Sequence, residues 1–158
     1  MGLDMYLYRK TYVKNWDHMN PEERIKINLS GNTKGIDSDK ICYVIEDAGY
    51  WRKANAIHGW IVEQCAGGVD QCQQIHVPKQ KLDELLQLCC SILGEESEEE
   101  RTKAALEKLP PTRGFFFGSN EAGDEWYVQD LRTTIEILWE VLSETDFAES
   151  EIIYQASW

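Results

Sequence analysis

Residues 50–60, Tyr-Trp-Arg-Lys-Ala-Asn-Ala-Ile-His-Gly-Trp, place three large aromatic side chains and several hydrogen-bonding side chains in a segment that otherwise has the pattern of a buried helix. At 100° per residue, the apolar residues around this stretch fall on one helical face, and Arg52, Asn55 and His58 fall on the same face. Polar groups on an apolar face are costly unless they are paired. We therefore expect these three side chains to be satisfied inside the fold, either by the protein itself or by a ligand.

The sequence around this stretch predicts one long helix over residues 38–64, ended by the glycine pair at 67–68. Its interior Gly49 and Gly59 each lower the helix propensity by about 1 kcal/mol relative to Ala. Both lie beside aromatic residues, which indicates a close approach by another element or by a ligand. Because the predicted helix is apolar on two sides, we expect it at the centre of the fold, with a sheet on one side and helices on the other.

Strands are predicted at both ends of the chain. Residues 3–9 alternate cleanly, with Leu3, Met5 and Leu7 facing one way and Asp4, Tyr6 and Tyr8 facing the other. The other predicted elements are a helix over 21–29, a strand over 74–77, a helix opened by Pro78, a helix with a capping box of Ser97 and Glu100, a strand at 115–117, a helix over 124–143 and a strand over 152–158.

This order of elements predicts an α+β fold, in which a small and mostly antiparallel sheet packs against the long central helix and several further helices. The chain of 158 residues has the size of one ordinary domain, and no internal repeat divides it. We therefore expect a single globular domain over residues 1–158.

Charge restricts the classes of partner. The 16 basic and 28 acidic side chains give a formal net charge of −12. Phosphate binding depends on clustered Lys and Arg, so this charge argues against direct nucleic-acid binding and against binding to an anionic membrane. No stretch approaches the roughly 20 apolar residues of a membrane span. An acidic chain of this kind favours a protein partner with a basic surface.

Motifs for cofactors, metals and nucleophiles are missing from the sequence. Five cysteines without a regular framework are typical of a reducing cytoplasm. The spacing of Cys65, Cys72 and His76 matches no common zinc site. The sequence also lacks Gly-x-Gly-x-x-Gly, a Walker lysine and a Gly-x-Ser-x-Gly elbow. We expect no cofactor and no metal, and we assign no catalytic residue.

The best candidate for a ligand site is the polar group on the predicted central helix. Arg52 needs an acidic or phosphate partner, and aromatic residues beside it could stack on a flat ligand such as a nucleobase. The alternative is an internal network in which Glu125 or Asp130 pairs with Arg52. The candidate ligand-binding residues, two of them from the opening strand, are Asp4, Tyr6, Tyr50, Trp51, Arg52, Asn55 and His58.

Four pieces of the sequence together carry a resemblance. They are the opening Met-Gly-Leu-Asp-Met-Tyr-Leu-Tyr, the central Tyr-Trp-Arg-Lys-Ala-Asn-Ala-Ile-His, the turn Gly-Phe-Phe-Phe-Gly-Ser and the closing Tyr-Gln-Ala-Ser-Trp. Over nearly its whole length the chain resembles a family of short, uncharacterised proteins encoded by bacteriophages and prophages. The resemblance transfers no catalytic residue. It implies a location in the bacterial cytoplasm during infection and a role accessory to the virion, and it favours a function directed at the host.

Three functions remain open at this point. Our leading hypothesis is a non-enzymatic, phage-type binding protein that acts on a host factor and inhibits antiviral defence. The first alternative is a protein that binds or sequesters a small nucleotide signal, and the second is a small hydrolase that uses His58. A closed and fully paired interior around His58 would favour a protein-binding role for the outer surface. An open cavity lined by Arg52 and an aromatic face would favour a small ligand.

Overall fold

The computed structural model describes residues 2–114 and 121–158. The described residues form an antiparallel sheet with strand order β2-β1-β4-β3 and four α-helices, so the predicted α+β class is confirmed. The elements, in chain order, are β1 (Asp4–Tyr12), β2 (Tyr43–Arg52), α1 (Asn55–Ala66), β3 (Ile75–His76), α2 (Lys79–Leu93), α3 (Glu98–Lys108), α4 (Glu125–Glu144) and β4 (Ser150–Ser157).

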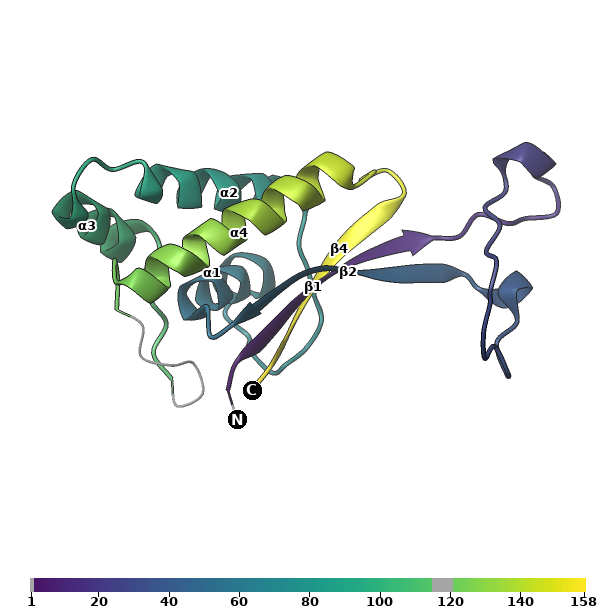
Figure 1. Cartoon of the computed structure of the whole chain (residues 1–158), viewed down its shortest axis with the longest axis horizontal. Helices are drawn as coiled ribbons and strands as arrows, with labels where there is room; N and C mark the ends of the chain where they lie inside the picture. The colour runs from purple at the N-terminus through teal and green to yellow at the C-terminus, as the bar shows by residue number, and fades with distance from the viewer. Residues whose placement is uncertain (1, 115–120) are drawn as a thin grey trace.

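The two strands at the ends of the chain pair with each other in the middle of the sheet. β1 and β4 are antiparallel, with Asp4 opposite Ser157 and Thr11 opposite Ser150. The helices gather on one side of the sheet, where α1 and α4 contact strands and α2 packs along α4 (Figure 1). The helices of the described residues therefore cover one face of the sheet only.

Alternation along β1 decides which side chains enter the core. Leu3, Met5 and Leu7 are buried on the face that the helices cover, whereas Tyr6 and Tyr8 on the opposite face keep partial exposure. This division confirms the prediction for residues 3–9. Burial of each large apolar side chain contributes about 1.5–3 kcal/mol, so the two faces of one strand differ strongly in their contribution to stability.

The predicted helix over residues 38–64 is wrong. Residues 43–52 form strand β2, the chain turns at Lys53 with a left-handed φ of 59°, and α1 begins only at Asn55. A shift in the pairing of β1 with β2 leaves Ala48 as an extra residue in β2. The residues that face the core therefore do not alternate regularly along the whole strand. The apolar spacing therefore imitates a helix, while β-branched and aromatic residues and the pairing with β1 favour the strand. The predicted end of the helix is confirmed, because Gly67 adopts a left-handed conformation after α1.

The predicted helix over residues 21–29 is also wrong. Only a 3-10 turn over Pro21–Glu23 forms, and the Asn20 side chain makes no capping hydrogen bond. The backbone N–H of Ile25 instead donates to the carbonyl of Lys14. Since no residue between 14 and 42 is buried, no packing stabilises a helix there.

Elements whose ends carry local signals lie where the sequence predicts them. Pro78 precedes α2, and the Ser97–Glu100 capping box opens α3. α4 follows Asp124, whose side chain accepts the N–H of Tyr127. The predicted strand at 115–117 lies outside the described residues.

Gly49 provides a test of the contact between β2 and α4. An added Cβ there would lie 2.5 Å from Cγ2 of Ile137. We expect Gly49→Ala to lower the free energy of unfolding by about 1–3 kcal/mol because it overpacks this contact, as measured by urea denaturation. In the double variant Gly49→Ala/Ile137→Ala, the side chain that obstructs the added Cβ is shortened. The loss of unfolding free energy should therefore be smaller than the sum of the losses in the two single variants. Additive losses would show that the two residues do not meet.

Candidate functional site

The structure divides the predicted site between the two faces of the sheet. At the end of β2, Tyr50 and Arg52 point to the open face and Trp51 points into the core. The Arg52 side chain is 67% exposed, and Asn55 and His58 are buried in α1. The prediction that Arg52 shares one inward face with Asn55 and His58 is therefore wrong. Because residues alternate in a strand, Arg52 faces away from Trp51 and from the core.

Four of the predicted residues come together on the open face. The Tyr50 hydroxyl donates to Oδ1 of Asp4 at 2.5 Å, and this hydrogen bond raises the pKa of the Tyr50 phenol. The Nε of Arg52 lies 4.0 Å from the same carboxylate oxygen. The Tyr6 ring lies beside Tyr50, with 5.3 Å between the centroids. Asp4 is thus the acid that pairs with Arg52, rather than Glu125 or Asp130 as the internal-network alternative expects.

Trp51 anchors the end of β2 to the helical layer. Its indole Nε1–H donates to Oγ1 of Thr134 at 2.9 Å, and the Thr134 hydroxyl donates in turn to the carbonyl of Asp130. Both side chains are buried. Trp51 is therefore a core residue and does not present its ring to a ligand.

His58 lies in a closed network with side chains distant in sequence. Its ring is 1% exposed, with Nδ1 2.7 Å from the Tyr154 hydroxyl and Nε2 2.9 Å from Oδ2 of Asp70. In the tautomer with the proton on Nε2, the ring donates to Asp70 and accepts the Tyr154 O–H at Nδ1. Burial raises the pKa of Tyr154, which keeps this hydroxyl protonated.

The His58 network joins three parts of the chain. Asp70 also accepts a hydrogen bond from the Trp158 indole at 3.3 Å, so α1, the loop after it and the end of β4 are held together. Sequence reasoning missed Asp70 and Tyr154, because nothing local marks them and the pairing of β4 with β1 had to be known first. A hydrolytic role for His58 would require that its ring be uncovered.

Asn55 borders a separate cleft between α1 and α3. The cleft has a volume of about 720 Å³ and is lined in part by Thr102, Arg113 and Glu121. Asn55 is the first residue of α1, so the positive end of this helix, with its backbone N–H groups, lies at the cleft. This cleft is the described region that most resembles the small-ligand site of the first alternative, although Arg52 and Trp51 do not line it.

The open face of β1 and β2 carries five of the seven tyrosines, and we call it the tyrosine face. The Tyr6 and Tyr8 rings stack with 6.0 Å between their centroids, and Tyr12 meets Tyr43 edge-on at 5.4 Å. Lys10 lies over the Tyr43 ring at 4.3 Å. The alternating pattern marks Tyr6 and Tyr8 as outward-facing, but only the pairing with β2 shows that the five rings share a surface. The tyrosine face consists of Tyr6, Tyr8, Tyr12, Tyr43 and Tyr50.

The Asp47 carboxylate on the tyrosine face is accessible to a cation from outside the chain. Lys10 pairs with Glu151 at 3.2 Å, and Arg52 lies near Asp4. Asp47 lies directly opposite Tyr8 and is exposed, and among the described residues it has no ion-pair partner. The surface therefore combines aromatic rings with a carboxylate that can bind a cation from outside.

Removing the Tyr154 hydroxyl tests the His58 network. We expect Tyr154→Phe to lower the free energy of unfolding by about 1–3 kcal/mol, because His58 Nδ1 then lies buried without this hydrogen bond. Chemical denaturation measures the change. Tyr43→Phe, which removes an exposed hydroxyl, is the matched control and should stay within about 0.5 kcal/mol of the unmodified protein. Equal effects of the two substitutions would contradict the network.

Three further findings bear on the class of this protein. Within the two described segments, no group of three or more His, Cys, Asp and Glu side chains could hold a metal ion. None of the helices in the part of the chain that the structure describes is long and apolar enough to cross a membrane. Comparison of the chain with protein-family models, curated proteins and solved structures found no significant match.

Proposed function

We propose that this chain is a non-enzymatic protein-binding module of phage type that binds a basic surface of a host factor through the tyrosine face. The observation that carries the proposal is the set of five tyrosine rings on the uncovered side of the sheet. Tyrosine is enriched in protein interfaces, because its rigid ring supplies a large contact area for little loss of conformational entropy.

Charge supports a basic protein as the partner. The net charge of −12 speeds the encounter with a positive surface and repels nucleic acid, although nucleobases also stack on aromatic rings. Asp47 offers a carboxylate opposite Tyr8, where an arginine from the partner could pair with it and stack on the ring. The closed network around His58 favours the same function, because it leaves recognition to the outer surface.

Capture from a bacterial lysate tests this proposal. We expect the immobilised protein to retain a host protein in stoichiometric amount, and Tyr6→Ala/Tyr50→Ala to lose it, since the double substitution removes two adjacent rings from the contact. Trp139→Ala on α4 is the matched control, because that indole is also exposed and lies off the sheet. Capture should weaken as salt increases, because screening reduces the electrostatic attraction.

A plaque assay tests the proposed role in antiviral defence. If the host factor belongs to a defence system, expression of the chain should raise phage plaque counts on a strain carrying that system and leave the counts unchanged on a strain without it. Tyr6→Ala/Tyr50→Ala should lose the effect. Absence of any stoichiometric partner, or equal capture by the double variant, would overturn the proposal.

A second candidate function is binding of a small nucleotide signal in the cleft beside Asn55. The volume of about 720 Å³, the Arg113 side chain and the positive end of α1 favour an anionic ligand there. The carboxylate of Glu121 in the lining opposes a highly charged phosphate. The tyrosine face therefore remains the better supported site.

Thermal-shift measurements with a panel of nucleotides test the second candidate. A ligand at one hundred times its Kd should stabilise the protein by about 2.7 kcal/mol, because it binds only the folded state. Arg113→Gln should abolish the shift, and Arg132→Gln, which removes an exposed arginine on α4, should preserve it. Failure of every nucleotide to raise the melting temperature would exclude this candidate.

A further inference from the structure

Residues 13–42, which we call the arm, join β1 to β2 and extend beyond the end of these two strands, away from the helices (Figure 1). β4 begins opposite Thr11, so the ribbon of β1 and β2 has no third strand beside it where the arm begins. Two 3-10 turns, Pro21–Glu23 and Ser38–Lys40, are its regular structure. The arm is therefore separated from the core.

The arm buries almost nothing of its own. Val13 is buried, and the other residues of the segment are half-buried or exposed. A two-stranded ribbon is marginally stable in water by itself, and ordering a segment of 30 residues must be offset by contacts. Within the described residues, the contacts of the arm are few and local, such as those of Trp16 with Tyr12 and of Ile25 with Lys14. The large apolar side chains that the arm exposes are Trp16, Ile25, Leu29 and Ile36.

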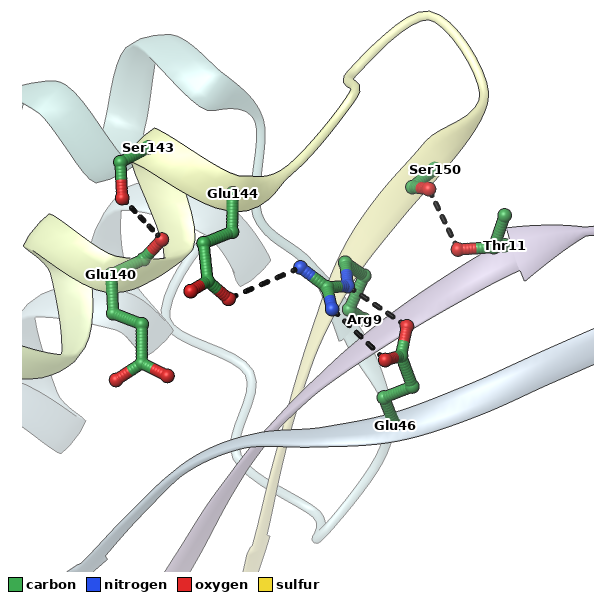
Figure 2. A network of polar contacts seen from close by, with 7 residues as sticks. All are labelled: Arg9, Thr11, Glu46, Glu140, Ser143, Glu144 and Ser150. Carbon is green, nitrogen blue, oxygen red and sulfur yellow. Dashed lines mark hydrogen bonds and ion pairs between the residues drawn. The ribbon is translucent and has the colours of Figure 1, made fainter.

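Polar contacts link the base of the arm to the rest of the chain, which we call the body. Arg9 donates two hydrogen bonds of 2.9 Å to the Glu46 carboxylate, and its guanidinium lies 3.9 Å from Glu144 at the end of α4 (Figure 2). The Thr11 and Ser150 hydroxyls meet at 2.7 Å beside this network. These contacts link β1, β2, β4 and α4 close to the point where the arm begins.

Charge distinguishes the arm from the rest of the chain. The arm holds five Lys or Arg residues and five Asp or Glu residues, so it is formally neutral. The remaining residues hold eleven basic and twenty-three acidic side chains and carry the whole net charge of −12. A basic host protein is attracted to the acidic body and gains no such attraction at the arm. Two copies of this chain repel each other through their acidic bodies, and contact through the neutral arms adds no further repulsion at the contact itself.

We propose that the arm is the contact between two copies of this chain, which associate around a two-fold axis by packing the apolar side chains of both arms together. The same patch on each copy then forms the interface, as in most homodimers. A stable contact of this type buries about 800 Å² on each partner, which an extended arm of 30 residues can supply. The arm adjoins the tyrosine face, because the Trp16 indole donates to the Tyr12 hydroxyl at 3.1 Å. Ile25, Leu29 and Ile36 are not part of that face, so this inference goes beyond the proposed function.

Sedimentation velocity of the full chain tests the dimer over a range of protein concentrations. We expect the measured mass to reach twice that of the 18.3 kDa chain as concentration rises. Association should strengthen at high salt, because screening reduces repulsion between the acidic bodies while the apolar contact persists. A mass of one chain at every concentration overturns the proposal, and so does a dimer that dissociates as salt increases.

Substitutions then locate the interface. Ile25→Ser/Leu29→Ser should weaken association by at least about tenfold, because it removes apolar side chains from both sides of the two-fold contact. Trp139→Ala, with an indole that is 66% exposed on α4, should leave the association unchanged. Since all three positions are exposed, thermal melts should show that each variant keeps its fold. A dimer that is unaffected by the arm substitutions overturns the proposal.

Discussion

The structure depends on one constraint, which is that the helices of the described segments cover only one face of a four-stranded antiparallel sheet. Alternation along β1 then sorts the side chains, with Met5 and Leu7 entering the core and Tyr6 and Tyr8 remaining on the open face. The same alternation in β2 turns Trp51 into the core and leaves Tyr50 and Arg52 on the open face. A single geometric rule thus produces both the buried core and the tyrosine face that we propose as the binding surface.

Polar residues in the interior contribute to assembly of the fold rather than to recognition. The contacts of His58 with Tyr154 and Asp70 join the central helix α1 to the last strand and to the loop between them. Trp51 and Thr134 make a corresponding link between β2 and α4. Because His58, Tyr154, Trp51 and Thr134 are buried and Asp70 is half-buried, we base the proposed function on the outer surface. The acidic body and the neutral arm further divide that surface into regions suited to different partners.

Sequence reasoning succeeds where the signals are local and fails where tertiary pairing decides. The strand at residues 3–9, the start of α2 at Pro78 and the capping box before α3 can all be predicted, because a few neighbouring residues determine them. β2 is missed because its extra residue at Ala48 interrupts the period of two and leaves a spacing that imitates a helix.

That error carries over to the candidate site. Asp4, Tyr6, Tyr50 and Arg52 do come together, but Asn55 and His58 lie in the interior. Asp70 and Tyr154 could not be predicted, since only the folded sheet brings them to His58.

Coverage of the sheet on one side is tested most directly by ¹⁹F NMR of fluorotyrosine-labelled protein with a soluble paramagnetic agent. The resonances of Tyr43 and Tyr50 should broaden while those of Tyr127 and Tyr154 stay sharp. Protection of Tyr43 and Tyr50 equal to that of the two buried tyrosines would contradict the open face.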